Sequence, residues 1–169
     1  MTIQTLNNSL SQVHDELYQV GFLTDAVYEV DVHLSSFGLC WGYYLNGDIH
    51  IVNRTVRDLL LWCIGRCGEW RPCRDTLRHE FGHAAWDKHC RVVRQLKGKS
   101  VFSPSRQCDD AYCDCIMTSY GETDAEEDFC EMFSIFVQRA GRMPSSVDCP
   151  VIRDKWRFIR RLGKQLNND

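Results

Sequence analysis

The sequence feature that most constrains this chain is the pentapeptide His79-Glu80-Phe81-Gly82-His83. On a helix, residues four positions apart share one face, so His79 and His83 can present imidazole nitrogens to a single cation. Glu80 is rotated by about 100° from His79, so its carboxylate can reach a water on the metal rather than the metal itself. The alternative, a surface helix that carries two histidines, leaves Gly82 unexplained, because a mid-helix glycine costs about 1 kcal/mol. The pattern therefore indicates a zinc hydrolase with two ligands and a general base.

The third zinc ligand must come from another part of the chain, because a catalytic zinc takes three protein ligands and one water. The metzincin continuation, with a third histidine soon after the second, is absent, since His83 is followed by Ala84-Ala85-Trp86. His89 lies beyond His83 on the same predicted helix, about 9 Å further along its axis, and is too far away to share the ion. A carboxylate on a later helix is the remaining common solution.

An acidic helix is predicted downstream, where Thr123-x-x-Glu126 has the form of a capping box. Glu127 and Glu131 lie four residues apart on one face of this helix. If that face points inward, two stacked carboxylates need a cation or a donor, whereas a solvated acidic face is the alternative interpretation. We expect Glu127 to be the third ligand, and Glu131 to accept the other N–H of a zinc-bound histidine. Glu126, Asp128 and Glu131 are the alternatives to Glu127.

These residues predict a mechanism. A zinc ion lowers the pKa of its bound water toward ~7, and Glu80 then takes the proton. The hydroxide attacks a carbonyl that the metal polarises, and a tyrosine hydroxyl can stabilise the oxyanion. The predicted function is therefore a zinc-dependent endopeptidase that hydrolyses peptide bonds with a Glu-activated, zinc-bound water.

Two blocks of the sequence also carry a family resemblance. They are His79-Glu80-Phe81-Gly82-His83-Ala84, and the later Thr118-Ser119-Tyr120-Gly121-x-Thr123 with Glu127-x-Phe129-x-Glu131-x-Phe133. In order and separation, the blocks resemble the catalytic domain of anthrax lethal factor and related gluzincin metalloproteases. The resemblance covers residues 74–140, under half of the chain.

The resemblance implies a role for each matching residue. The implied roles are zinc ligands for His79, His83 and Glu127, general base for Glu80, an outer neighbour of the ligands for Glu131, and the phenol near the oxyanion for Tyr120. It also implies that the hairpin around Asn46-Gly47 offers an edge strand to an extended peptide. The chain lacks the toxin's translocation and recognition domains, so the toxin's substrate is not transferred to it.

The rest of the chain predicts an α+β fold, with a small antiparallel sheet packed on the active-site helix and further helices. Residues 5–20 have the periodicity of an amphipathic helix. Alternating residues 29–34 predict a half-buried strand, and an Asn-Gly turn joins two further strands at 40–45 and 48–52. The sheet is expected to have two or three strands.

Helices are also predicted at residues 55–64, from residue 72 to about 94, and at 154–166. Residues 65–71 are a predicted loop, and 98–114 a polar connection. Trp156, Phe158 or Ile159, and Leu162 are the expected inward residues of the last helix, and its outward face is basic. That face is either solvated or a docking surface for an acidic partner.

Length and charge limit the class of protein. The 169 residues fit one domain, here a zinc metallopeptidase domain over residues 1–169. A net charge of −3 does not indicate a nucleic-acid or membrane binder, and no apolar run is long enough to span a bilayer. The N-terminus lacks the features of a signal peptide, so we expect a cytoplasmic protein, or one delivered into a host cell without a cleaved signal.

The chain contains ten cysteines, an unusual number. Without a signal peptide, thiols or metal ligation are favoured over a disulfide framework. A second, structural zinc can be held by Cys108, Cys113 and Cys115 together with Cys90 or Cys73. Buried thiols and disulfides are the alternatives.

Three functions are consistent with these patterns. The first is an endopeptidase acting on a protein or peptide substrate. The second is a non-catalytic zinc-binding module that engages a partner, but such a module has no use for a base at Glu80. The third is a zinc amidase acting on a non-protein substrate such as cell-wall peptide.

Overall fold

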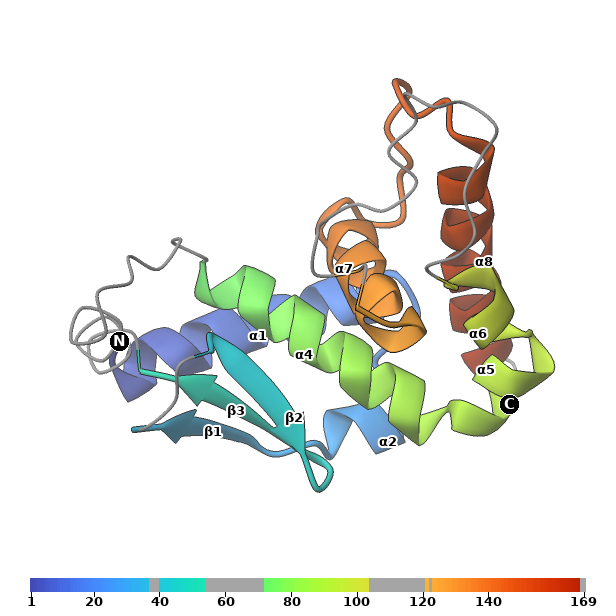
Figure 1. Cartoon of the computed structure of the whole chain (residues 1–169). Coiled ribbons are helices and arrows are strands. Elements are labelled where there is room, and N and C mark those ends of the chain that lie inside the picture. The colour runs from blue at the N-terminus through green and yellow to red at the C-terminus, as the bar shows by residue number, and fades with distance from the viewer. Residues whose placement is uncertain (37–39, 54–71, 104–120, 122, 168–169) are drawn as a thin grey trace.

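A small sheet lies at one side of a group of helices in the computed structural model, which describes residues 1–36, 40–53, 72–103, 121 and 123–167 (Figure 1). The helices are α1 (Ile3–Gln19), α2 (Asp25–Tyr28), α4 (Cys73–Lys88), α5 (Cys90–Gln95), α6 (Gly98–Val101), α7 (Ala125–Gln138) and α8 (Pro150–Leu166). The strands are β1 (Val32–Ser35), β2 (Gly42–Leu45) and β3 (Asp48–Val52).

The predicted α+β class is confirmed. The predicted helix at 55–64 and the loop at 65–71 lie outside the described residues. None of the described helices combines the length and apolar character that crossing a bilayer requires.

The N-terminal helix α1 follows the predicted amphipathic pattern. Its stripe of Leu6, Val13 and Leu17 is buried, because one apolar residue in each turn faces the core. The Thr2 hydroxyl caps its first turn by accepting the N–H of Thr5. Gly21, at φ +79°, lets the chain turn away behind the helix.

The sheet has the strand order β1-β3-β2 and is mixed. β2 and β3 form the predicted antiparallel hairpin, with Asn46 and Gly47 both at positive φ, as a type I′ turn requires. β1 pairs with β3 in parallel, so the expectation of an antiparallel sheet is wrong for this strand. The Asn-Gly signal specifies only that the two strands flanking the turn pair with each other. It does not specify the partner of β1, which pairs with β3 across a connection that contains β2.

The long helix α4 is the element on which the others pack. It lies between the β2–β3 hairpin on one side and α7 on the other, with α1 also against it (Figure 1). Gly82 allows the close crossing with α7, since a Cβ there would stand 3.0 Å from the Cα of Cys130. The prediction of one helix to residue 94 is wrong, because the chain leaves helical geometry at His89 and restarts as α5.

Aromatic side chains form much of the core. Phe129 and Phe133 of α7 pack on each other, Phe22 meets Phe133 edge-on, and Trp86 packs on Phe129. The predicted inward residues of the last helix are buried, and that helix begins at Pro150 rather than at residue 154. This core holds α7 against α4, which places the carboxylates of α7 beside the histidines of α4.

Candidate metal centre

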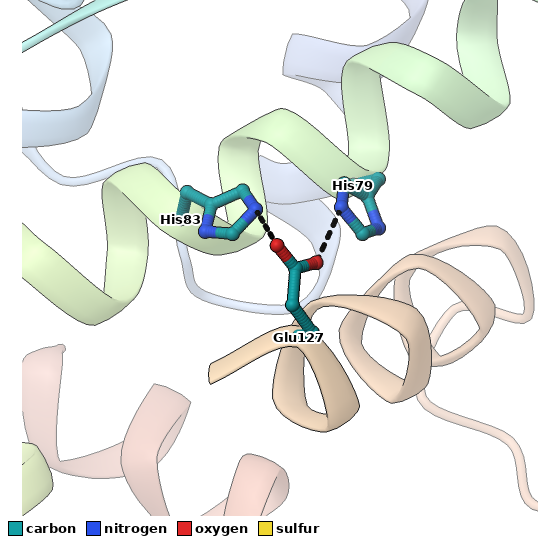
Figure 2. A group of neighbouring side chains, drawn as sticks. All are labelled: His79, His83 and Glu127. Carbon is teal, nitrogen blue, oxygen red and sulfur yellow. Dashed lines mark ion pairs between the residues drawn. The ribbon is translucent and has the colours of Figure 1, made fainter. Parts of the chain in front are cut away.

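The crossing of α4 and α7 brings together His79, His83 and Glu127, as Figure 2 shows. Nε2 of His79 lies 3.2 Å from Oε2 of Glu127, and Nε2 of His83 lies 3.5 Å from Oε1 of the same carboxylate. One potential ligand atom from each of the three residues lies within 4.8 Å of the others. The two rings, one helical turn apart on α4, have their centroids 5.1 Å apart. Two imidazole nitrogens and a carboxylate oxygen are a donor set that suits zinc.

Two further carboxylates of α7 face the far side of each ring. Glu131 Oε1 lies 2.7 Å from Nδ1 of His79, and Glu126 Oε1 lies 2.8 Å from Nδ1 of His83. A carboxylate accepts a hydrogen bond, so a ring that binds a metal ion through Nε2 can keep its remaining proton on Nδ1, facing the carboxylate. Each Nε2 is thereby directed toward Glu127 and kept available as a metal ligand.

The role of Glu126 was missed in the sequence, where it was assigned to a capping box. The structure instead has Asp124 as the N-cap of α7, and its side chain accepts the N–H groups of Glu126 and Glu127 at 2.7 and 3.1 Å. The expected cap at Thr123 is therefore wrong. With the helix start satisfied by Asp124, the Glu126 side chain reaches His83. One signal in the sequence could have revealed this role. Asp124 is a second residue able to cap the helix, and the adjacent glutamates Glu126 and Glu127 follow it after a single alanine.

Glu80 lies on α4 next to His79 and is 4% exposed. It lines a cleft of about 330 Å³ together with the two histidines, Glu127 and residues of β2. Gly42 of β2 makes room for it, because a Cβ at Gly42 would stand 3.0 Å from Oε1 of Glu80. The carboxylate thus reaches the cleft beside the histidine pair without being one of the three clustered ligands.

The electrostatics of the cluster favour a bound cation. Burial acts to lower the pKa of His79, but the hydrogen bonds to Glu127 and Glu131 outweigh it, and the pKa is raised. The pKa of His83 is raised in the same way, against burial, by its partners Cys130, Glu126 and Glu127. Burial acts to raise the pKa of Glu127, yet the two histidines lower it to about 2. A cluster that holds protons this strongly has excess negative charge when the histidines are neutral, and a metal ion can compensate it.

A second group of potential ligands lies at the surface of the sheet. Asp31, His33 and Asp48 bring one ligand atom each within 4.8 Å of the others. The parallel register of β1 on β3 produces this proximity, which the sequence did not predict. The side chains of His33 and Asp48 are 50% and 42% exposed, against 5% for His79 and 16% for Glu127, so solvent competes strongly there.

The remaining predicted residues are only partly described. Tyr120, Cys108, Cys113 and Cys115 lie outside the described residues. Cys73 begins α4 and Cys90 follows its end, about 25 Å apart along a helix, so at most one of them can join a shared metal site. Cys130 of α7 is buried, and burial raises the pKa of its thiol to about 12, so it is a packing residue rather than a nucleophile.

Comparisons with protein-family models, with curated proteins and with solved structures give no match. The argument for function therefore depends on the geometry and chemistry of this site.

Proposed function

We propose that this chain is a zinc-dependent endopeptidase of the gluzincin type, acting on a protein or peptide. The observation that carries the proposal is the cluster of His79, His83 and Glu127 with Glu80 beside it in the same cleft. The donor set fits zinc, since it offers two imidazole nitrogens and one carboxylate. A zinc ion held there would act as a Lewis acid on a scissile carbonyl and would make water more acidic.

The side chains of this chain then divide the remaining work. The carboxylate of Glu80 accepts a proton from the attacking water and then delivers this proton to the leaving amine. Glu126 and Glu131 hold the Nδ1 protons of the histidines, which fixes the orientation of both rings. The edge strand β2, whose residues Gly42 to Tyr44 line the cleft, can pair with the backbone of an extended substrate.

The test is cleavage of an unbiased peptide library by the zinc-loaded protein, by Glu80→Gln and by the matched control Glu29→Gln. Glu29 is an exposed carboxylate at the end of α2 and does not line the cleft. We expect the same cuts from the wild type and Glu29→Gln, and a rate reduced by about 10²–10⁴-fold in Glu80→Gln, because the general base is lost.

Zinc content is measured for each protein in parallel. Cuts that persist unchanged in Glu80→Gln would refute the mechanism. A zinc-loaded wild type that cuts nothing would refute the endopeptidase activity on peptides and would favour a binding module.

A further inference from the structure

A second, larger pocket opens beside the metal-binding cleft. It has a volume of about 900 Å³ and lies between the tip of the β2–β3 hairpin, the end of α4, and helices α5 and α6. Tyr44 and Glu126 line both the pocket and the cleft, so the two spaces adjoin each other at these side chains. A chain lying in the cleft along β2 can therefore extend side chains into this pocket, which is large enough for several of them.

The pocket wall is cationic. It carries four basic side chains, Lys88, Arg94, Lys97 and Lys99. The two acidic residues of the wall already have partners: Asp87 accepts the Tyr44 hydroxyl at 2.9 Å, and Glu126 accepts Nδ1 of His83 at 2.8 Å. Counted with these two carboxylates, the four basic side chains leave the wall with a formal excess of two positive charges.

The four cations also have no ion-pair partner elsewhere in the part of the chain that the structure describes. Among the described residues, Arg94 donates only to the carbonyl of Cys90 on its own helix, at 3.3 Å. This local excess is found in a chain whose net charge is −3. A concentration of cations against the overall charge of the molecule favours an anionic ligand at this place.

The floor of the pocket is apolar and closely packed. Trp86 and Val93 lie on it and are 7% and 2% exposed. Gly98 allows α6 to approach this floor, because a Cβ there would stand 2.6 Å from Val93 and 3.2 Å from Trp86. Cations around an indole floor suit a carboxylate on an aliphatic stem better than a fully hydrated ion.

We propose that this pocket binds acidic side chains of a peptide whose backbone lies in the metal-binding cleft, and that it selects substrates with Asp or Glu close to the scissile bond. The second part of this inference, the selection of substrates, rests on the proposed function. The first part, the binding of acidic side chains, can be tested separately. A peptide is favoured over a nucleic acid because the pocket adjoins a cleft bordered by an edge strand. A phosphate backbone, in contrast, needs a track of cations across a surface.

The binding test uses the zinc-loaded Glu80→Gln full-length protein, so that the peptide is not consumed. The probes are two fluorescein-labelled peptides of equal length, one with three glutamates beside a central Leu-Leu pair and one with glutamines at those positions. Fluorescence anisotropy should show that the glutamate peptide binds about tenfold more tightly at low ionic strength, as expected from a few partly exposed ion pairs. The preference should shrink in 0.5 M salt, because added salt shortens the Debye length and screens exposed ion pairs.

Substitutions in the pocket wall test whether the preference for the glutamate peptide arises there. Charge reversal by Arg94→Glu with Lys99→Glu should abolish the preference for the glutamate peptide. Arg91→Glu is the matched control, because Arg91 lies on the same helix α5, is exposed and does not line the pocket. If the reversal variant does not fold, Lys97→Gly replaces it, since Lys97 has φ +60° and glycine is tolerated in that conformation. Lys97→Gly should reduce the preference in part.

The outcomes separate this inference from the proposed function. Equal binding of the two peptides, or a preference that Arg91→Glu removes as fully as the pocket variant, would overturn the inference. So would tighter binding of a single-stranded oligonucleotide than of the glutamate peptide. If the wild type cleaves both peptides at one rate, hydrolysis holds and the acidic preference fails. If the glutamate peptide binds as expected and neither peptide is cleaved, the pocket assignment holds and the proposed hydrolysis fails.

Discussion

Glu127 and Asp128 are neighbours on α7, yet they face different helices and different partners. Glu127 lies between the histidines of α4, with its oxygens 3.2 and 3.5 Å from their nitrogens. Asp128 lies 2.6 Å from Nζ of Lys155 on α8, and these side chains are 1% and 0% exposed. A histidine can exchange its proton for a metal ion, whereas a lysine paired with a buried carboxylate serves as its structural counter-ion. The first cluster is thus suited to chemistry and the second to holding α8 against α7.

The largest expected effect is on the structural pair. Lys155→Met should reduce the free energy of unfolding by about 3–5 kcal/mol, because it leaves the Asp128 carboxylate buried without its cation. Urea denaturation of the metal-free protein measures this change in the free energy of unfolding. Burial already raises the pKa of Asp128 more than Lys155 lowers it, so this carboxylate has little tolerance for the loss of its partner.

The control for this prediction is the double variant Asp128→Leu with Lys155→Met. It should recover most of the lost stability, since no uncompensated charge stays buried. A single variant as stable as the wild type would show that the pair contributes nothing to the packing of α8.

The next largest effect is expected on zinc affinity, from substitution of Glu127. Glu127→Gln should weaken zinc binding by more than the ~10–100-fold that loss of an outer partner costs, because it removes a proposed ligand. Competition with a chromogenic chelator measures the affinity. Asp128→Asn is the neighbouring control and should leave zinc affinity unchanged in whatever fraction folds. Unchanged zinc affinity in Glu127→Gln would contradict the ligand assignment and would direct attention to Glu126 or Glu131.

A smaller effect is expected from the outer carboxylates. Glu126→Gln and Glu131→Gln should each reduce zinc affinity by about 10–100-fold, because each holds the Nδ1 proton of one histidine. The side chain of Glu131 is 8% exposed and that of Glu126 is 41% exposed, so the loss should be larger for Glu131. The same chelator competition measures both. Equal losses would mean that solvent does not weaken the contact of Glu126 with His83.

The smallest effect is the pH dependence of the metal-free protein. The pKa of Glu127 falls from 4.5 to about 2 on folding, so its stabilisation is complete above pH 4.5 and is lost as the pH falls toward 2. The raised pKa of each histidine stabilises the fold fully below pH 6.5, and this contribution is lost only as the pH rises through the raised values. Unfolding free energies should therefore decrease by about 1–2 kcal/mol between pH 4.5 and 2.

Glu127→Gln provides the comparison for this curve. Its acid limb should be flatter than that of the wild type, because the carboxylate that titrates is gone. An identical acid limb would assign the pH dependence to other carboxylates. Zinc affinity should also increase with pH, since the histidines must lose their protons to bind the metal.

Local patterns in the sequence were sufficient for several elements. The spacing of His79 and His83 predicted two ligands on one helical face, and Asn46-Gly47 predicted the hairpin, because both signals depend on residues close together in the chain. The stripe of α1 and the inward face of α8 were likewise readable from helical periodicity. The partnership of Glu127 and Glu131 with the motif came from chemical need and from the family resemblance, and the structure brings these residues to the histidines.

Other features were decided only by the tertiary structure. The parallel pairing of β1, the capping of α7 by Asp124 and the contact of Glu126 with His83 depend on how distant segments meet. The burial of Lys155 is the clearest case, since a lysine on a basic helix has the local pattern of a solvated residue. What the sequence determined by itself is the set of residues that we propose to bind zinc and to activate water. The packing of α7 between α4 and α8 decided which carboxylate faces each cation, because neighbouring residues on a helix differ in direction by about 100°.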